Sequence, residues 1–333
     1  MSNVIKILVI RFSSIGDIVL TTPVVRCLKQ QLPNAEIHFC TKKTYGDTIK
    51  NNPNIDRCYL FDTDLYRLIQ CLRTEKYDYI IDLHNNFRTK LIKEVLNVRS
   101  FTVNKLNLYK WLYVSFKLTI MPKEHLVDRY LATVLPLRVK DDGLGLDFFI
   151  GNADHVDVSQ LPLTHQFGYV AYVIGGQYAT KRLPVVRMIE LCHKIGGPVV
   201  LLGGEGDREA GERVVGAVGS ELVYNACGKY NLCQSASLLE QSSVVFSHDT
   251  GLMHIAAALK KKVYSIWGNT TPQLGMYPYR TPYVVLEKQG LSCRPCSKIG
   301  SDHCPQEHFK CMNELVFIFD RNDLEMISTV NLA

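Results

Sequence analysis

The chain has 333 residues, of which 47% are hydrophobic and 21% are charged, and its formal net charge is +6. This composition excludes a disordered, collagen-like or coiled-coil protein, and at roughly 150 residues per domain the length predicts about two domains. The positive charge is local, because residues 88–140 contain eleven Lys or Arg and three Asp or Glu. Such a tract indicates one anionic partner and argues against general nucleic-acid binding.

The N-terminal apolar run is broken by Lys6 and ends at Arg11, so it does not read as a signal peptide. We find no stretch of about 18 uncharged apolar residues that would predict a membrane span. We therefore expect a cytoplasmic protein whose eleven cysteines are mostly reduced core thiols.

Two series of alternating strands and helices follow along the chain. Apolar, β-branched runs predict strands at residues 5–10, 36–41, 57–61 and 77–83, and the first helical pattern runs to about residue 31. Loop signals interrupt this rhythm between about residues 100 and 165. A second series predicts strands at 169–174, 198–202, 221–224, 244–247 and 262–267.

This alternation predicts an α/β protein with two parallel-sheet domains, 1–160 and 161–333, facing each other across a cleft. A last helix, at about residues 321–330, could pack back on either domain. Ligands of open parallel sheets bind outside the carboxyl ends of the strands, so both domains are expected to present their βα loops to the cleft.

The turn after the first strand, residues 11–17, contains Asp17 at the start of a helix. A carboxylate there could accept a proton from an attacking hydroxyl, or it could simply cap the helix. This turn lacks the three glycines of a dinucleotide-binding loop, and residues 203–209 place Glu209 where the third glycine would stand. The chain has neither a Walker A sequence nor a Gly-x-Ser-x-Gly elbow.

Two loops of the second series are candidate phosphate sites. Asp249, Thr250 and Gly251 stand between a strand and a small-residue helix, whose free N–H groups and dipole would attract an anion. Lys181 and Arg182 follow Gly175 in the other loop, and their cations could balance a diphosphate. An ordinary helix cap and solvated surface cations are the alternative interpretations.

These segments together resemble glycosyltransferase family 9, the lipopolysaccharide heptosyltransferases. Residues 11–23 are similar to the family's N-terminal signature, residues 247–258 to its nucleotide-sugar motif and residues 268–272 to the loop that follows, within a match over about residues 4–280. The resemblance implies a GT-B fold and inverting transfer of heptose from ADP-heptose to the inner core of lipopolysaccharide. A family member with another sugar donor, a sugar-nucleotide epimerase of similar build and a non-catalytic binding protein are the alternatives.

The resemblance also implies roles for individual residues. It makes Asp17 the catalytic base and Lys181 the residue that holds the donor phosphates, and it requires no cofactor. The expected donor-binding residues are Thr180, Lys181, Glu209, Asp249, Thr250, Gly251 and His254, with Glu205 and Asp207 as competitors of Glu209 for the ribose. The expected acceptor-binding residues are Ser14, Gly16, Asn85, Arg88, Lys105 and Lys110.

The basic tract then suits the acceptor, a lipid A-linked core sugar. Aromatic residues such as Tyr109 and Trp111 alternate there with Lys105, Lys110 and Lys117, as expected for a phosphorylated lipid headgroup at a membrane surface. A solvated helix face is the alternative. We accordingly expect peripheral contact with the inner face of the inner membrane.

Four cysteines are concentrated near the C-terminus, at Cys293, Cys296, Cys304 and Cys311. Four thiolates can hold a structural zinc ion in a tetrahedral site. The second pair does not have the Cys-x₂-Cys spacing of a zinc ribbon, so redox-labile disulfides and unligated thiols remain alternatives.

Overall fold

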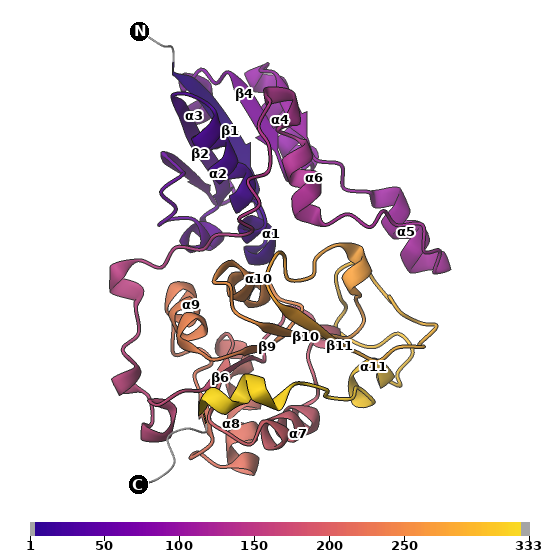
Figure 1. Ribbon diagram of the computed structural model, residues 1–333. Coiled ribbons are helices and arrows are strands. Elements are labelled where there is room, and N and C mark those ends of the chain that lie inside the picture. The colour runs from indigo at the N-terminus through magenta and orange to yellow at the C-terminus, as the bar shows by residue number, and fades with distance from the viewer. Residues whose placement is uncertain (1–3, 328–333) are drawn as a thin grey trace. The chain divides into compact units, whose positions relative to one another are not determined.

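The computed structural model describes residues 4–327, which form two open parallel sheets covered by helices (Figure 1). The first sheet has five strands in the order β3-β2-β1-β4-β5, and the second has six in the order β11-β10-β9-β6-β7-β8. Every neighbouring pair of strands is parallel. The predicted α/β class with two parallel sheets is confirmed.

The first sheet and its helices come from the N-terminal half of the chain. Its strands are β1 (Ile5–Ile10), β2 (Ala35–Lys42), β3 (Arg57–Phe61), β4 (Tyr79–Asp82) and β5 (Ser100–Thr102). Its helices are α1 (Ile15–Val19), α2 (Thr22–Gln31), α3 (Leu65–Thr74), α4 (Phe87–Leu96) and α6 (Leu126–Ala132).

The second sheet contains β6 (Val170–Val173), β7 (Val199–Leu202), β8 (Val223–Asn225), β9 (Val245–His248), β10 (Val263–Trp267) and β11 (Tyr283–Glu287). The remaining helices are α5 (Asn107–Phe116), α7 (Val185–Ile195), α8 (Arg208–Val218), α9 (Leu232–Gln241), α10 (Gly251–Ala258) and α11 (Lys310–Asn313). Short 3₁₀ helices include η6 (Ala179–Lys181), η7 (Glu205–Asp207) and η9 (Arg321–Ile327).

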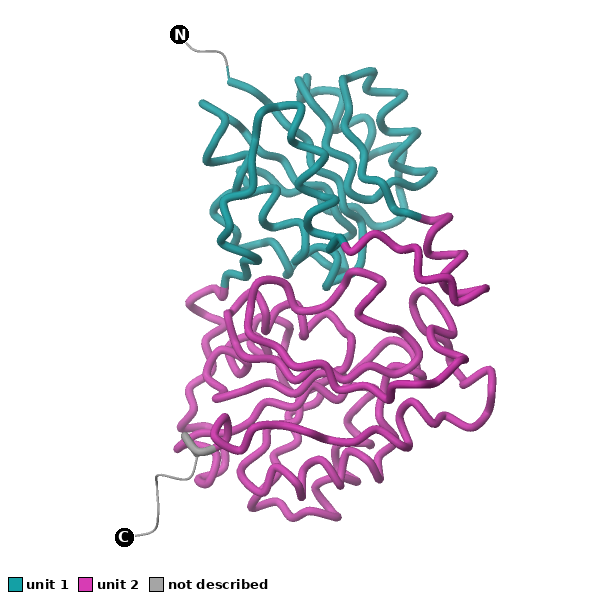
Figure 2. Tube along the Cα trace, turned by 45° about the vertical axis from the view of Figure 1, so that its right-hand side comes forward, with its two compact units in different colours: residues 1–106, 124–149 teal, residues 107–123, 150–333 magenta. Residues whose placement is uncertain are grey.

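The chain divides into two compact units (Figure 2). Unit 1 contains residues 1–106 and 124–149, and unit 2 contains residues 107–123 and 150–333. These units differ from the expected ranges of 1–160 and 161–333, because the chain leaves unit 1 at residue 107, contributes α5 to unit 2, and returns. Sequence periodicity could not show this excursion, which depends on contacts distant in sequence.

Burial on both faces explains why the strands form a parallel sheet. Along β1, Leu8 and Ile10 belong to a core cluster with Leu72 of α3 and Ile92 of α4. Ile7 and Val9 alternate with them and are equally buried. In unit 2, the larger cluster joins β6, β7 and β9 to α7 and extends to Phe317 near the C-terminus. Continuous apolar runs are therefore required in the central strands.

The structure departs from the predicted elements in three respects. The single helix expected after the first turn is split into α1 and α2, because Pro23 has no N–H to donate to the preceding turn. Strands β5 and β11 lie at sheet edges and were not predicted. Residues 321–327 form the 3₁₀ helix η9, which contacts unit 2 through an ion pair of 2.6 Å between Asp323 and Lys262; residues 328–330 lie outside the described part.

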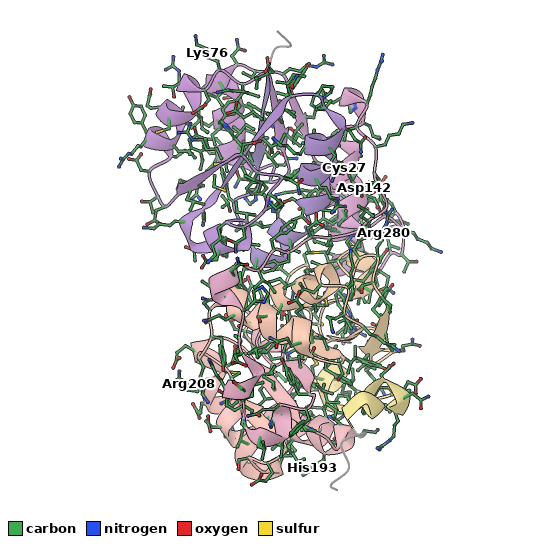
Figure 3. All side chains as sticks on the ribbon, turned by 60° about the vertical axis from the view of Figure 1, so that its left-hand side comes forward. Cys27, Lys76, Asp142, His193, Arg208 and Arg280 are labelled. Atoms are coloured by element: carbon green, nitrogen blue, oxygen red, sulfur yellow. The ribbon has the colours of Figure 1, made fainter. Side chains whose placement is uncertain are left out.

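A buried arginine ties the end of unit 1 back to its first helices. Arg26 of α2 is 4% exposed, and its guanidinium binds Asp142 at 2.7 Å, the carbonyl of Gly145 at 2.9 Å, and Asp147. Hydrogen bonds from Arg26 lower the pKa of Asp142 to about 2. Figure 3 shows Asp142 beside Cys27, which follows Arg26 in α2. The return segment of unit 1 is therefore fixed by charge as well as by packing.

We expect Arg26→Met to lower the free energy of unfolding by about 3–5 kcal/mol, because it leaves two carboxylates without their buried partner. Chemical denaturation at pH 7 measures this loss, and the exposed Arg73→Met is the control. The wild-type contribution of Asp142 is present above pH 4 and falls as the pH drops towards 2, since its pKa is depressed in the folded state. Equal stability of both variants would contradict this role.

Candidate functional site

The first candidate site lies where the strand order of unit 1 reverses. Strands β2 and β3 lie on one side of β1, and β4 and β5 lie on the other. The loops after β1 and β4 therefore diverge at this point, which is where open parallel sheets bind ligands. These loops carry Arg11 to Asp17 and Asp82 to Asn86.

Arg11 joins the two loops. Its guanidinium donates to the carbonyl of Ser13 at 2.7 Å and to that of Leu83, after β4, at 2.8 Å. It also forms an ion pair of 2.7 Å with Oδ1 of Asp17. Burial, the largest single effect, lowers the pKa of Arg11, but the charges of Asp17, Tyr130 and Asp82 and the Asp17 hydrogen bond together outweigh it, and the pKa is raised. Arg11 is therefore a fixed cation beneath the Asp17 carboxylate.

Asp17 also caps its own helix, as the alternative interpretation had it. Its Oδ2 accepts hydrogen bonds from the backbone N–H of Ser14 at 3.2 Å and from the Ser14 hydroxyl at 3.0 Å. The same carboxylate therefore caps α1 and pairs with Arg11. About a fifth of the side chain is exposed, 19%, so a substrate hydroxyl can reach a carboxylate that is already oriented.

Charged groups from the β4 and β5 loops surround this pair. Asp82 is fully buried; its Oδ1 accepts from the N–H groups of His84 and Asn85, and its Oδ2 pairs with Lys93 at 2.9 Å. Burial and the charges of Arg11 and Lys105 lower the pKa of His84 to about 4. Burial and Arg11 also lower the pKa of Lys105. His84 is therefore neutral at neutral pH and sits among cations.

The expected acceptor-binding residues are distributed over both units. Unit 1 contains Ser14 at the start of α1, buried Gly16, half-buried Asn85 and Lys105, and exposed Arg88 on α4. Lys110 belongs to α5 and therefore to unit 2. Ser14 is brought together with Asp17, and the charge of Lys105 acts on the same group.

The second candidate site lies at the corresponding reversal in unit 2, between β6 and β9. After β9, Asp249 accepts a hydrogen bond from Thr270 at 2.9 Å and pairs with Lys181 at 2.7 Å. Lys181 comes from η6, the loop after β6. The two loops that sequence analysis selected independently are thus joined by an ion pair at the carboxyl edge of the sheet.

Helix α10 begins at this point with its first turn uncapped. Thr250 occupies the N-cap position, but its side chain makes no capping bond, and its Oγ1 is buried without a hydrogen-bond partner. Native proteins pair nearly all buried polar atoms, so the unpaired hydroxyl at this helix N-terminus is a candidate hydrogen-bond donor to a ligand. The hydroxyl, the helix dipole and Lys181 could together bind a phosphate group. His254 lies in the same helix and is 2% exposed.

Glycines in the neighbouring loops allow the Asp207 side chain to lie close to the backbone. A Cβ on Gly175 would lie 2.7 Å from Oδ2 of Asp207, and one on Gly203 would lie 2.9 Å from the same carboxylate. Asp207 accepts from the N–H of Gly204 at 2.9 Å and pairs with Arg182 at 3.3 Å. Of the three carboxylates considered for ribose binding, Asp207 is thus engaged within the loop, Glu205 pairs with Arg208 at 2.7 Å, and Glu209 is exposed on α8.

The cysteine-containing segment braces this site. The carbonyl of Ser301 accepts from Oγ1 of Thr180 at 2.8 Å, and the N–H of Cys296 donates to the carbonyl of Asn269 at 2.9 Å. Arg294 donates to the carbonyl of Thr270, also at 2.9 Å. Residues 294–301 therefore hold the loop after β6 through Thr180 and the loop after β10, whose Thr270 donates to Asp249.

The four cysteines themselves are free thiols. Cys296 donates to the carbonyl of Cys293 at 3.1 Å, and the Cys293 sulfur lies 4.0 Å from Nε2 of His308. Burial, followed by the neighbouring thiol of Cys293, raises the pKa of Cys296 to about 11. We searched residues 4–327 for three or more Cys, His, Asp or Glu side chains whose ligand atoms lie within 4.8 Å of one another. Glu36, His38 and Glu75 meet this criterion, and the four cysteines do not. Zinc binding here stays a prediction.

Helix α5 contacts these loops within unit 2. The hydroxyls of Tyr113 and Thr271 lie 3.1 Å apart, and Lys117 donates to the carbonyl of Pro295 at 2.6 Å. Lys117 is therefore a structural contact and not a solvated cation. In the part of the chain that the structure describes, we find no helix with the length and apolarity that crossing a membrane requires.

Residues 65–305 match the family model described as glycosyltransferase family 9 (heptosyltransferase). The chain belongs to this family. It is 25% identical over 293 residues to lipopolysaccharide heptosyltransferase 2 of Salmonella typhimurium, covering 80% of this chain and 84% of the relative. It is 24% identical to lipooligosaccharide heptosyltransferase 2 of Haemophilus influenzae, covering 93% and 99%.

Solved structures show the same fold. A glycosyl transferase family 9 protein from Veillonella parvula superposes with a TM-score of 0.70 at 21% identity, covering 85% of this chain and 86% of that one. The E. coli ADP-heptose LPS heptosyltransferase II gives 0.66 at 22% identity, covering 93% and 98%. This family 9 glycosyltransferase therefore has the predicted GT-B fold.

Sequence reasoning missed Arg11, Asp82 and Thr270 of the family 9 enzyme as partners of the site. A charged residue at the end of a buried strand is a local signal that could have indicated Arg11, which follows β1, and Asp82, the last residue of β4. Thr270 could not be found this way, because its bond to Asp249 spans 21 residues and depends on how β9 and β10 align.

His248 provides a test of how the unit 2 loops are held. Its Nδ1 lies 3.1 Å from the carbonyl of Ile174, and its Nε2 accepts from the N–H of Leu183 at 3.1 Å. The bond to Nε2 requires the neutral ring with its proton on Nδ1, and burial lowers the pKa of His248 to about 4.

We expect unit 2 to lose about 3 kcal/mol of stability as the pH falls from 6.5 towards 4, because the unfolded chain protonates His248 first. In His248→Gln this pH-dependent loss should be absent, although the variant is less stable at pH 7. The exposed His193→Gln is the matched control. Denaturant titrations at several pH values measure the slope, and an unchanged slope in His248→Gln would refute the assignment.

Proposed function

We propose that this glycosyltransferase transfers heptose from ADP-heptose to the inner core of lipopolysaccharide, with inversion at the anomeric carbon. The observation that carries the proposal is the Asp17 carboxylate, oriented by Arg11 and Ser14 at the reversal of strand order in unit 1. A base held in this position is what an acceptor hydroxyl needs for direct displacement. The names of the relatives, lipopolysaccharide and lipooligosaccharide heptosyltransferases, support the choice of sugar and acceptor.

In the proposed reaction, the acceptor oxygen attacks the anomeric carbon of the donor and gives its proton to Asp17. The new carbon–oxygen bond forms as the bond from that carbon to the diphosphate breaks, and ADP leaves with the electron pair. Lys181 and the N-terminus of α10 would stabilise the charge that develops on the leaving diphosphate. The buried Oγ1 of Thr250 would donate to one of its oxygens.

We expect Asp17→Asn to lower heptosyl transfer by about 10²–10⁴-fold, because the amide cannot accept the proton. ADP affinity should change less than twofold, since Asp17 lies in unit 1 and the proposed phosphate site lies in unit 2. Transfer is measured with a panel of nucleotide sugars and a lipid-linked core acceptor, ADP binding by calorimetry, and folding by thermal melting.

The exposed Asp47→Asn is the matched control and should behave as wild type. Wild-type turnover in Asp17→Asn would remove Asp17 from the mechanism. Conversion of a nucleotide sugar by the wild-type enzyme without any acceptor would contradict the transferase proposal and favour an epimerase.

We further propose that α5 places the enzyme against the inner membrane surface, where the lipid-linked acceptor lies. Its exposed apolar side chains include Leu108 at 65%, Trp111 at 47% and Phe116 at 59%. The rings of Trp111 and Phe116 are 5.3 Å apart and form one aromatic patch. Exposed aromatic residues on a helix with nearby cations are typical of interfacial membrane binding.

We expect the double variant Trp111→Ser, Phe116→Ser to bind anionic vesicles of phosphatidylglycerol and phosphatidylethanolamine at least tenfold more weakly, because each ring loses its apolar contact with lipid. Vesicle sedimentation measures the binding. Tyr66→Ser, an exposed aromatic residue on α3 of unit 1, is the control. Equal vesicle binding by all three proteins would exclude α5 as the contact.

A further inference from the structure

A buried arginine in unit 1 has no partner for half of its guanidinium group. Arg129 of α6 is 3% exposed, and one terminal nitrogen, Nη1, donates a long bond of 3.3 Å to the carbonyl of Asn104. Its Nε and Nη2 atoms are buried without any hydrogen-bond partner. Burial, the largest cause, lowers the pKa of Arg129. Burying a cation without partners is costly, so the arrangement needs an explanation other than stability.

The unpaired atoms are of a particular kind. Nε and Nη2 form one edge of the planar guanidinium and point their hydrogens in parallel. This edge is the donor pair that binds two oxygens of a carboxylate or phosphate at once. The unused capacity of Arg129 is therefore that of an oxyanion site and not of a single missing hydrogen bond.

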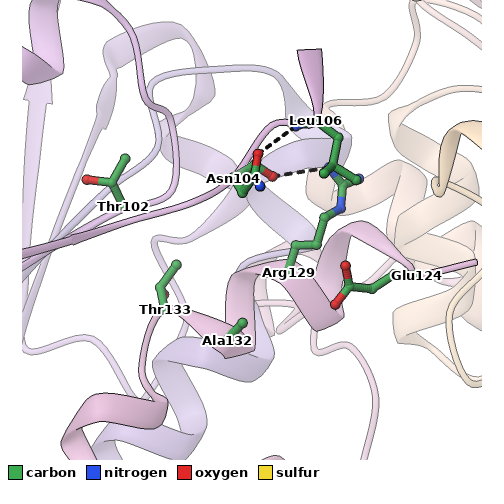
Figure 4. A pocket seen from close by; sticks show the side chains of 7 residues that line it. All are labelled: Thr102, Asn104, Leu106, Glu124, Arg129, Ala132 and Thr133. Carbon is green, nitrogen blue, oxygen red and sulfur yellow. Dashed lines mark hydrogen bonds between the residues drawn. The ribbon is translucent and has the colours of Figure 1, made fainter. Parts of the chain in front are cut away.

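A cavity of about 190 Å³ is lined by Arg129 together with Thr102, Asn104, Glu124 and Thr133 (Figure 4). Lys93 donates to the hydroxyl of Thr102 at 2.7 Å, which leaves the Thr102 hydrogen free to donate. Glu124 is exposed and its charge acts on Arg129, with no ion pair between them. The cavity thus has room for a small anionic group beside Arg129. Lys93, which is already paired with Asp82, lies on the far side of Thr102, and Glu124 is a carboxylate that an entering anion must displace or avoid.

The cavity is adjacent to the candidate catalytic group. The next residue of α6, Tyr130, is fully buried, and the guanidinium of Arg11 lies 5.9 Å from its ring centre. The charges of Arg11, Asp17 and Arg129 all act on the Tyr130 hydroxyl, which burial raises in pKa. Tyr130 therefore connects Arg129 to the Arg11–Asp17 pair within one unit.

We propose that Arg129 is a specificity-determining residue of the acceptor site, where it binds an oxyanion of the sugar acceptor by a two-pronged contact. This inference rests on the proposed function, since it assumes that unit 1 binds the acceptor. The oxyanion is a sugar carboxylate or a phosphate ester. Because Arg129 is shielded from water, such a contact is strong and selects charged over neutral acceptors.

Arg129→Met tests the proposal by two opposed effects. The KM for the lipid-linked acceptor should rise about 10- to 100-fold, because a charge-assisted pair of hydrogen bonds is lost. The melting temperature should stay the same or rise, because an unpaired buried cation is removed. Arg129→Lys should also raise the KM, since a lysine lacks the parallel donors. The exposed Arg138→Gln is the control and should alter neither quantity.

Glu124→Gln gives the converse result. Removal of the competing carboxylate should lower the acceptor KM about twofold. If Arg129 serves only to hold Glu124, then Glu124→Gln and Arg129→Met would change KM alike and both would lower the melting temperature. That outcome, or an unchanged KM in a folded Arg129→Met, would overturn the proposal.

A titration that needs no turnover separates this proposal from the proposed function. The Nε–H resonance of Arg129, assigned with the Arg129→Lys variant, is followed by NMR as methyl glucuronide, inorganic phosphate or neutral methyl glucoside is added. We expect a saturable shift with glucuronide for a carboxylate site, or with phosphate for a phosphate site, and none with the glucoside. Absence of a shift with both anions overturns the oxyanion site even where heptosyl transfer is intact. A shift without transfer upholds the site and refutes the proposed function.

Discussion

The contacts of Arg11 hold the unit 1 site together. Its guanidinium reaches the loop after β1, the end of β4, the Asp17 carboxylate and the ring of Tyr130. These are the segments that diverge where the strand order reverses, so without a shared partner each loop would be positioned only by its own strand. A buried cation that needs all of these acceptors fixes them relative to one another, and the proposed base is oriented as a consequence.

In unit 2, an ion pair fixes the two diverging loops relative to one another. Lys181 and Asp249 come from the loops after β6 and β9. Residues 294–301 bind Thr180 of the first loop and Thr270, which in turn donates to Asp249. The contact leaves the first turn of α10 uncapped and the Thr250 hydroxyl without a partner. Each unit thus has a buried polar side chain with atoms that lack a hydrogen-bond partner, Arg129 in unit 1 and Thr250 in unit 2. Stable packing would not retain such groups, whereas ligand binding would use them.

The central strands and the loops that follow them could be predicted from sequence, and the tertiary partners could not. β1 and β9 are buried on both faces, so their apolar runs are unambiguous, and the polar residues after them mark the carboxyl edge of each sheet. β5 has three residues and lies at an edge, so its pattern carries little signal. The split between α1 and α2 was readable from Pro23. The excursion of α5 into unit 2 and the empty edge of Arg129 depend on contacts far apart in sequence.

The central claim is that this family 9 enzyme transfers heptose by a single direct displacement. The most direct measurement is the anomeric configuration of the heptose in the product, determined by the one-bond carbon–hydrogen coupling at the anomeric carbon after reaction with ADP-heptose and a core acceptor. Our account predicts a configuration opposite to that of the donor. Retention of the donor configuration would contradict the single displacement and the role of Asp17 as its base.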